Sequence, residues 1–286
     1  MKRLALLLAA MGIVSAAAFA EAPVLKVTSI GQEIEIENNS GGVDIGDSVF
    51  FGTMVNLSYG DWTYGVTGGK FWSVDTEDGF ESINSRLQLD AMKTVNENWQ
   101  LGARYRAQKD FDRYYARAAW DYGMIYGAAD VWYNAANDSS NPNDNIEMEL
   151  FPIGLKYGNF KAAWFVNYVK FLGSVDREGK EEYTEHQIRL YADLYKGEKL
   201  TVNTEYRLTL NADADYREKT PDSESLYKDF GRSRLYLGAS YKVNESLNVY
   251  GKYGYEIRDK EYINSGKDDK NANYYGDLIL GWSYTF

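Results

Sequence analysis

The chain has 286 residues and a formal net charge of −11, with 25 Tyr, 26 Gly, 4 Pro and no Cys. Without cysteine it has no disulfide framework, and an acidic chain without a basic patch is a poor partner for nucleic acid. No run of about eighteen apolar residues occurs, so this is not a helical membrane protein.

The first twenty residues have the pattern of a secretory signal peptide. Lys2 and Arg3 precede an apolar run from Leu4 to Val14, and small residues end the segment at Ala18-Phe19-Ala20. The run is too short to span a membrane as a helix. We expect cleavage after Ala20, which leaves 286 minus 20, or 266, residues (21–286) with a formal charge of −13.

Residues 21–286 predict a succession of β-strands. Aromatic and β-branched residues alternate with polar ones between clusters of Gly, Asn and Asp, whereas helical spacing of apolar residues is rare. Six very short connections alternate with seven others, which requires fourteen strands. The predicted strands are Val24–Glu37, Val49–Tyr59, Trp62–Val74, Ile83–Val95, Trp99–Lys109, Asp112–Asp121, Met124–Tyr133, Ile146–Tyr157, Phe160–Leu172, Tyr183–Tyr195, Leu200–Leu210, Gly231–Val243, Leu247–Arg258 and Asn273–Phe286.

The short connections have recognisable turn chemistry. Gly60-Asp61 and Gly158-Asn159, each between two aromatic residues, suit two-residue hairpins with glycine at the first turn position. Residues 96–98 and 244–246 predict one three-residue turn used twice. Except for the brief one near residue 110, the other connections are long and hydrophilic, and the longest, 211–229, is acidic enough to suggest either a gate or simply a solvated loop.

The two faces of each predicted strand differ in polarity. In Leu247–Arg258, Val249, Tyr253 and Ile257 share one face, while Lys252 and Glu256 share the other. Most strands reach the 9 to 11 residues, roughly, that a membrane-spanning strand needs. Amphipathic rings, which a lipid interface favours, lie beside the short turns at Tyr59, Trp62, Trp99, Tyr157, Phe160 and Tyr195. These features favour an all-β fold, a transmembrane antiparallel up-and-down barrel, over a secreted β-sandwich.

The turns also fix which inward residues of neighbouring strands face each other. A register error of one residue would place basic side chains in lipid, at a cost of about 2 to 4 kcal/mol each near the midplane. The predicted cross-strand pairs are Asp90–Arg104, Gln88–Arg106, Arg234–Glu256 and Arg189–Glu205.

Charged residues of the predicted inner face form two groups, which we take as candidates for solute and ion selection. Three consecutive strands carry the first group: Arg86, Arg104, Arg106, Arg113 and Arg117. The next two strands carry Asp130, Glu147 and Glu149, with Asp121 at a turn. Such segregation would create a field across the lumen that selects ions by charge. The alternative is that these residues merely pair and solvate one another.

The C-terminal strand has an apolar face that includes Leu278, Leu280, Trp282, Tyr284 and Phe286. We expect it to face lipid and to pair with the first strand, closing the sheet. The ending, with Trp282, Tyr284 and Phe286, resembles the assembly signal that the barrel-assembly machinery reads in Gram-negative outer-membrane proteins.

Signal peptide, strand number and length together resemble the OmpG-type monomeric porins and, more loosely, the fusobacterial FomA-type porins. The resemblance implies a barrel in the lipid of the bacterial outer membrane. It would enclose a water-filled channel for passive diffusion of small hydrophilic solutes and ions. No internal motif specific to either family occurs, so no functional residue is carried over. A surface adhesin or receptor on a barrel scaffold stays open, as does the choice between monomer and trimer.

The sequence offers little for catalysis. The one histidine, His186, shares a face with Ile188 and Leu190 and is expected to point outward, with no third group to orient it. Phosphate-loop, zinc and calcium-loop patterns do not occur. We therefore expect no enzymatic activity, no cofactor and no metal site.

Overall fold

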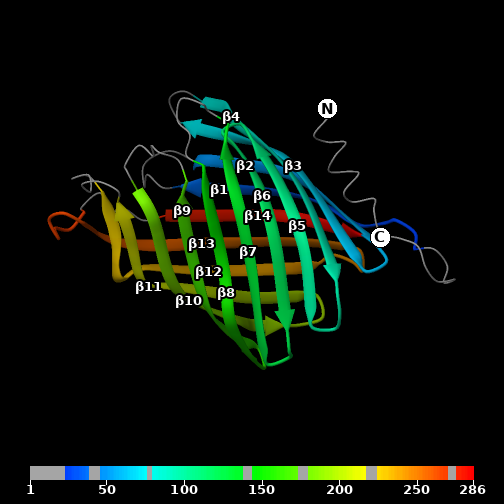
Figure 1. The fold of residues 1–286 in the computed structure, drawn as a ribbon. Coiled ribbons are helices and arrows are strands. Elements are labelled where there is room, and N and C mark those ends of the chain that lie inside the picture. The colour runs from blue at the N-terminus through cyan, green and yellow to red at the C-terminus, as the bar shows by residue number, and fades with distance from the viewer. Residues whose placement is uncertain are drawn as a thin grey trace.

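A computed structural model describes residues 23–38, 46–75, 79–137, 144–172, 180–216, 224–269 and 275–286. These residues form a fourteen-stranded antiparallel sheet that closes into a barrel, in which each strand pairs with its sequence neighbours and β1 pairs with β14 (Figure 1). The predicted fold class is therefore confirmed. In the described ranges no helix has the length and apolarity needed to cross a membrane.

The strands are as follows: β1 (Lys26–Asn38), β2 (Gly46–Tyr59), β3 (Trp62–Asp75), β4 (Gly79–Thr94), β5 (Trp99–Gln108), β6 (Phe111–Asp121), β7 (Ile125–Ala136), β8 (Asn145–Tyr157), β9 (Phe160–Phe171), β10 (Lys180–Lys196), β11 (Leu200–Tyr216), β12 (Ser225–Lys242), β13 (Leu247–Tyr262) and β14 (Tyr275–Thr285).

The predicted loop 211–229 is wrong at both ends. Strand β11 continues to Tyr216, and β12 begins at Ser225, so much of this acidic segment is sheet. The predicted start of β12 at Gly231 instead falls in a β-bulge between Tyr227 and Arg232, where Phe230 has a φ of 59°. Polar residues suggested a loop, but a ladder that extends into water can carry polar residues on both faces. Residues 217–223 lie outside the described residues.

The terminal strand is paired along both edges. On one side Ile34 of β1 lies opposite Leu280, and the amide of Phe286 donates to the carbonyl of Thr28 at 3.1 Å. On the other side Val249 of β13 lies opposite Trp282. The predicted closure of the sheet is thus confirmed, and the C-terminus lies at the barrel end that carries the short turns (Figure 1).

Two of the predicted turn types are present. Gly60 and Gly158 have φ values of 55° and 56° in two-residue hairpins, a region that glycine enters at little cost. The repeated three-residue turn is held by an asparagine side chain in both places. Asn96 Oδ1 accepts the amides of Asn98 and Trp99, both at 2.9 Å, and Asn244 Oδ1 accepts the corresponding amides at 2.9 and 2.8 Å.

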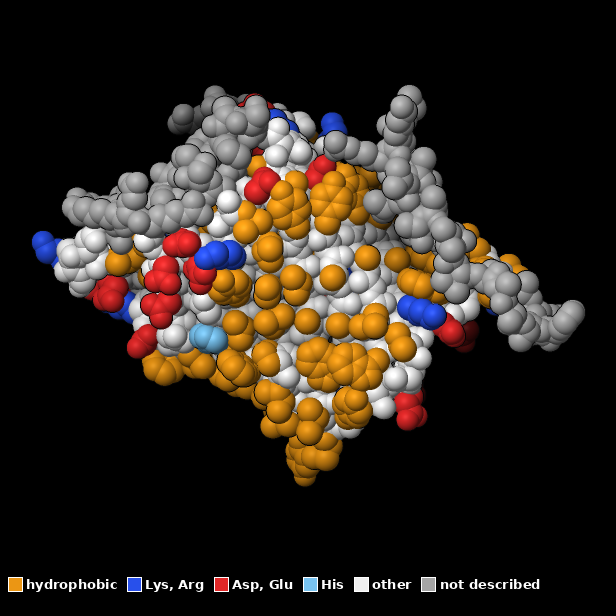
Figure 2. All heavy atoms as spheres, viewed as in Figure 1, with side chains coloured by type: hydrophobic (Ala, Val, Ile, Leu, Met, Phe, Trp, Pro, Cys, Tyr) orange, Lys and Arg blue, Asp and Glu red, His pale blue; other side chains and the backbone are white. Residues whose placement is uncertain are grey.

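The outer surface carries a broad apolar band, and charged side chains gather toward the ends of the strands (Figure 2). Leu237, Tyr253 and Ile257 leave 55%, 52% and 61% of their surface exposed on this side. Aromatic residues lie beside the short turns, where Trp99 Nε1 donates to Tyr122 Oη at 2.8 Å. This distribution matches the expected lipid-facing surface.

The inner surface contains aromatic rings that lie flat against glycines of a neighbouring strand. A Cβ atom at Gly254 would come within 2.3 Å of the Tyr236 ring, and one at Gly69 within 2.5 Å of Phe50. Tyr236 and Phe50 are 3% and 4% exposed. Glycine thus leaves room for the rings along the wall, which keeps these large side chains out of the middle of the lumen.

Candidate functional site

The inner face of β4–β7 contains a neutral cluster of two arginines and two aspartates. Arg104 Nε lies 2.6 Å from Asp90 Oδ1, and Arg117 Nη1 reaches the same oxygen at 2.7 Å. Arg117 Nε also lies 2.9 Å from Asp130 Oδ1. The predicted pair Asp90–Arg104 is confirmed. Asp130 lies among the arginines and not on a separate acidic wall, because its strand is the next neighbour of the strand that carries Arg117.

This cluster lines a recess of about 530 Å³ toward the turn end of the lumen. Asn56 and Gln88 complete its polar wall, and Asn56 Nδ2 donates to Ser29 Oγ at 2.9 Å. Asp90, Arg104 and Arg117 are the charged residues of the cluster that line the recess, while Asp130 lies outside its lining.

Three other arginines on the same wall have no carboxylate oxygen within 4.0 Å among the described residues. Arg106 Nε donates to Gln88 Oε1 at 2.9 Å, as its predicted register requires, and Arg113 Nε donates to Asn134 Oδ1 at 2.9 Å. Arg86 lies between two rings, with its guanidinium carbon 4.7 Å from the centroids of both Phe50 and Phe71. The five arginines of the first predicted group thus divide into two that form ion pairs within 4.0 Å and three that do not, which we call the non-neutralised arginines.

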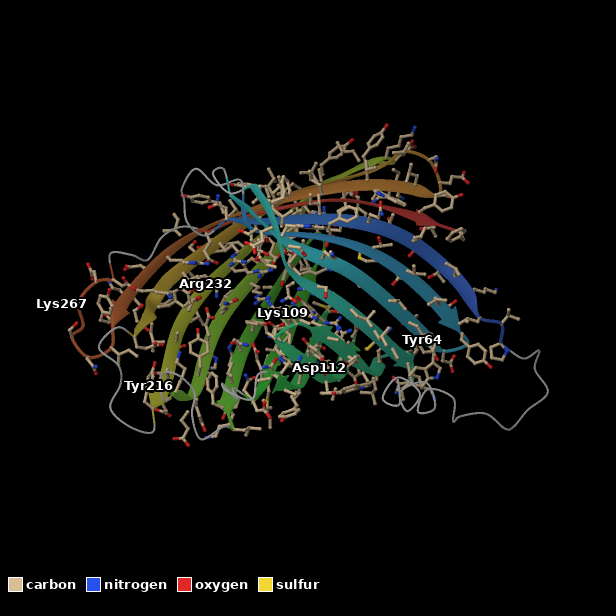
Figure 3. All side chains as sticks on the ribbon, turned by 90° about the horizontal axis from the view of Figure 1, so that it is seen from above. Tyr64, Lys109, Asp112, Tyr216, Arg232 and Lys267 are labelled. Atoms are coloured by element: carbon tan, nitrogen blue, oxygen red, sulfur yellow. The ribbon has the colours of Figure 1, made fainter. Side chains whose placement is uncertain are left out.

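The opposite wall, formed by β10–β14, contains a dense ion-pair network around Glu256. This carboxylate is fully buried and contacts Arg232, Arg234 and Arg258. Its predicted partner Arg234 is confirmed. Arg232 Nη1 also reaches over β11 to Glu185 Oε2 at 3.2 Å. Figure 3 shows Arg232 from above, together with Tyr216 and Lys267 toward one end of the barrel and Tyr64 toward the other.

The predicted pair Arg189–Glu205 is wrong by two residues. Arg189 lies opposite Arg207, and Glu205 lies opposite Tyr191. The hairpin closes with Lys196 opposite Thr201, nearer its turn than predicted, and the β-bulge between Asp193 and Tyr195 then moves the register back by one residue. A shift of two residues preserves the face, so both side chains still point inward. Arg189 stacks over Phe165 at 3.4 Å, while Glu205 contacts Arg207 at 2.5 Å and Lys252 at 2.8 Å.

Within the described part of the chain, the remaining predicted lumen residues make no ion pair within 4.0 Å with the arginines of β4–β6. Glu147 accepts a hydrogen bond from Asn167 Nδ2 at 3.1 Å, and Glu149 faces Asp130 across the β7–β8 pair. Asp121 lies at the turn end, where the ammonium group of Lys156 and the amide of Gly123 lower the pKa of its carboxyl group. Asp121 therefore belongs to the rim of the barrel.

A second recess of about 440 Å³ lies near the turn end between β7 and β11. Its wall combines the rings of Tyr126, Phe151 and Tyr191 with the charged residues Lys161 and Glu205. Its three aromatic rings distinguish it from the recess on β1–β6, which has one.

His186 lies on the outer face, as expected. Its Nδ1 accepts a hydrogen bond from Trp164 Nε1 at 3.3 Å, and the two rings stack at 5.7 Å. Figure 2 shows it at the edge of the apolar band. In the part of the chain that the structure describes, no group of three or more His, Cys, Asp or Glu side chains is arranged to hold a metal ion.

The sequence did not predict the ion-pair network around Glu256 or the stacking of Arg86 and Arg189 on aromatic rings. Alternation placed Arg234, Glu256 and Arg258 on one side of the sheet, but it gave no sign that Glu185 lies within reach of Arg232. That contact crosses an intervening strand, so it depends on barrel curvature. A useful signal would have been glycine opposite an inward aromatic residue, as in Gly254 opposite Tyr236.

No protein-family model matches this chain. No curated protein has a matching sequence. Among solved structures, a bacterial polysaccharide outer-membrane secretin aligns with a TM-score of 0.55 and 9% identity, over 91% of this chain and 98% of its own. An anion-selective porin from Comamonas acidovorans aligns with a TM-score of 0.49 and 11% identity, over 92% of this chain and 100% of its own. OmpT, an outer membrane protein of Vibrio cholerae, aligns with a TM-score of 0.47 and 13% identity, over 93% of this chain and 100% of its own. The first likeness shows a shared barrel fold.

Proposed function

We propose that this protein is an outer-membrane channel for passive diffusion of small hydrophilic solutes and ions. The observation that carries the proposal is the opposite chemistry of the two faces of one closed sheet. Apolar side chains cover the outside, while ionised and amide side chains line the inside. A barrel of this kind satisfies its backbone hydrogen bonds in lipid, and at fourteen strands it is closer in size to open porins than to filled eight-stranded barrels.

The outer-membrane location rests on the same surface and on export by the predicted signal peptide. The secretin that shares this barrel fold is an outer-membrane protein by its name, which supports the location. Assembly by the barrel-assembly machinery, through Trp282, Tyr284 and Phe286, belongs to the proposal. The described part of β14 presents this aromatic face outward.

The lumen supports a channel better than an enzyme. Inward carboxylates contact arginine, lysine or amide groups on several strands, and the single histidine lies on the outer face. General acid–base chemistry needs a group placed against a substrate, whereas the groups that line this lumen contact one another. We therefore propose a function without a catalytic step or a cofactor.

Planar lipid bilayers test the channel directly. Purified, refolded protein should give stepwise increases in conductance in KCl, each step corresponding to one inserted barrel, while detergent alone should give none. An adhesin or receptor built on a closed barrel would insert without conducting. Folded protein that remains electrically silent over many insertions would therefore overturn the proposal in favour of that alternative.

The orientation has its own test. Protease added to intact cells should cut between β11 and β12 and should spare the Gly60-Asp61 turn, because short turns of such barrels face the periplasm. Cleavage at the turn with protection of the β11–β12 connection would reverse the topology.

A further inference from the structure

The three non-neutralised arginines, Arg86, Arg106 and Arg113, lie together on β4–β6. Arg106 lies directly opposite Arg113 in the β5–β6 register. Arg86 of β4 lies opposite Gln108, which is the next inward residue after Arg106 on β5. Like charges that face each other across a sheet destabilise it. Within the described ranges no carboxylate oxygen comes within 4.0 Å of these three guanidinium groups.

Aromatic rings cover these guanidinium groups. Arg86 lies between Phe50 and Phe71, Arg113 lies 4.2 Å from Phe111 and 5.6 Å from the Trp132 ring, and Arg106 lies 5.7 Å from the Tyr115 ring. Cation–π contacts of this kind hold the cation in place without neutralising its charge. The guanidinium groups are therefore fixed on the wall and keep their positive charge.

The donors of this cluster are incompletely used. Nε of Arg106 and of Arg113 each meets an amide oxygen. Nε of Arg86 is buried, and no described residue provides it with an acceptor. By contrast, the N–H groups of Arg104 and Arg117 contact Asp90 and Asp130. Arg104 is one inward position from Arg106 on β5, and Arg117 is two inward positions from Arg113 on β6. One wall thus contains arginines in direct ion pairs beside a set in which Arg86 and Arg113 interact with Glu35, Glu37 and Glu147 only at longer range.

We propose that Arg86, Arg106 and Arg113 form a binding site in the lumen for the carboxylate group of small organic acids. An anion there would relieve the repulsion between the facing arginines and accept hydrogen bonds from their terminal N–H groups. A planar carboxylate matches the planar guanidinium fork and forms two parallel hydrogen bonds, which a spherical chloride ion cannot do. The inference rests on the proposed function, because a channel supplies the path by which the acid reaches the site.

Binding is measured first without conduction. Isothermal titration of refolded barrel in detergent with sodium succinate should give saturable binding for the wild-type protein. The double variant Arg106→Gln/Arg113→Gln should weaken it at least tenfold. Arg207→Gln removes one positive charge from the opposite wall, where Arg207 contacts Glu205, and should bind as the wild type does. Inorganic phosphate, whose oxygens also fit the guanidinium fork, is the comparison anion.

The single variant Arg113→Lys tests the site even if the double variant does not fold. Lysine keeps the charge but loses the fork, so succinate affinity should fall while affinity for chloride changes little. Undiminished succinate binding in either variant would overturn the proposed site. Phosphate binding as tight as succinate binding would overturn the preference for carboxylates.

Bilayer recordings separate this inference from the proposed function. In a conducting wild-type channel, succinate should reduce the chloride current in a saturable way, and the double variant should resist that block. Succinate binding by a barrel that never conducts would sustain the site and overturn the channel. Conduction without succinate binding or block would sustain the channel and overturn the site.

Discussion

Two walls of the same lumen handle positive charge in different ways. On β11–β13, Arg207, Arg232, Arg234 and Arg258 all contact carboxylates. On β4–β6, Arg86, Arg106 and Arg113 contact rings and amides instead. The first arrangement cancels charge and ties strands together, whereas the second keeps charge available to the lumen. Inward arginines can therefore stabilise the sheet on one wall and, as we propose, bind a solute on the other.

The largest effect is expected at the centre of the neutralised wall. Glu256→Gln leaves three arginines around a side chain that can no longer neutralise them, so stability should fall by about 3 to 5 kcal/mol. Urea unfolding in phospholipid vesicles, followed by tryptophan fluorescence, measures it. Asp121→Asn, at an exposed ion pair of the rim, is the control and should change little. An unchanged unfolding midpoint for Glu256→Gln would mean that the network is solvated.

The next largest effect on stability is expected from introducing a charge on the outer face of a strand, compared with the inner face of the same strand. Leu237 is exposed on the outer face of β12, and Ser240 lies on the inner face opposite Tyr250. Leu237→Lys should cost about 2 to 4 kcal/mol in a bilayer, because it places an ammonium group in hydrocarbon, whereas Ser240→Lys should cost far less. The same vesicle unfolding assay compares them. Equal losses for the two variants would contradict the assignment of faces.

A smaller energetic effect with a clear electrical signature is expected on the non-neutralised wall. Arg106→Gln should shift selectivity toward cations while stability stays within about 1 kcal/mol of the wild type. Arg104→Gln should shift it less, since Asp90 remains held by Arg117. Reversal potentials in a KCl gradient decide the order of the two variants. A larger shift for Arg104→Gln would mean that the paired arginines dominate the field in the lumen.

The smallest effect is expected outside the apolar band, at the half-exposed pair of Lys170 and Glu182. Their hydrogen bond raises the pKa of Lys170 above its ordinary value of 10.5 and lowers the pKa of Glu182 below its ordinary value of 4.5. The contribution of Glu182 is present above pH 4.5 and is lost as the pH falls through its lowered pKa. That of Lys170 is present below pH 10.5 and is lost as the pH rises through its raised pKa.

Lys170→Met should therefore lower Tm slightly between these limits, and the difference from the wild type should vanish at both extremes of pH. Thermal unfolding at a series of pH values measures that difference. A difference that persists unchanged at low pH would assign the effect to packing of the lysine side chain and not to the ion pair.

The sequence by itself determined the strands, their order and their two faces. Alternation with a period of two is local, so Val249 and Lys252 could be assigned to opposite faces without coordinates. The residues of the turns determined the register of the adjoining strands where the turn had the predicted type. The repeated Asn-Glu turns correctly placed Asp90 opposite Arg104 and Arg234 opposite Glu256.

The tertiary structure decided which charges meet. The β10–β11 hairpin closes with Lys196 opposite Thr201, and together with the following bulge this places Glu205 opposite Tyr191 and not opposite Arg189. Barrel curvature lets Arg232 reach Glu185 and Arg117 reach Asp90 over an intervening strand. Pairing across a strand depends on closure and side-chain direction, which alternation does not encode. For that reason the sequence identified the arginines of the lumen, whereas the structure separated the neutralised ones from Arg86, Arg106 and Arg113.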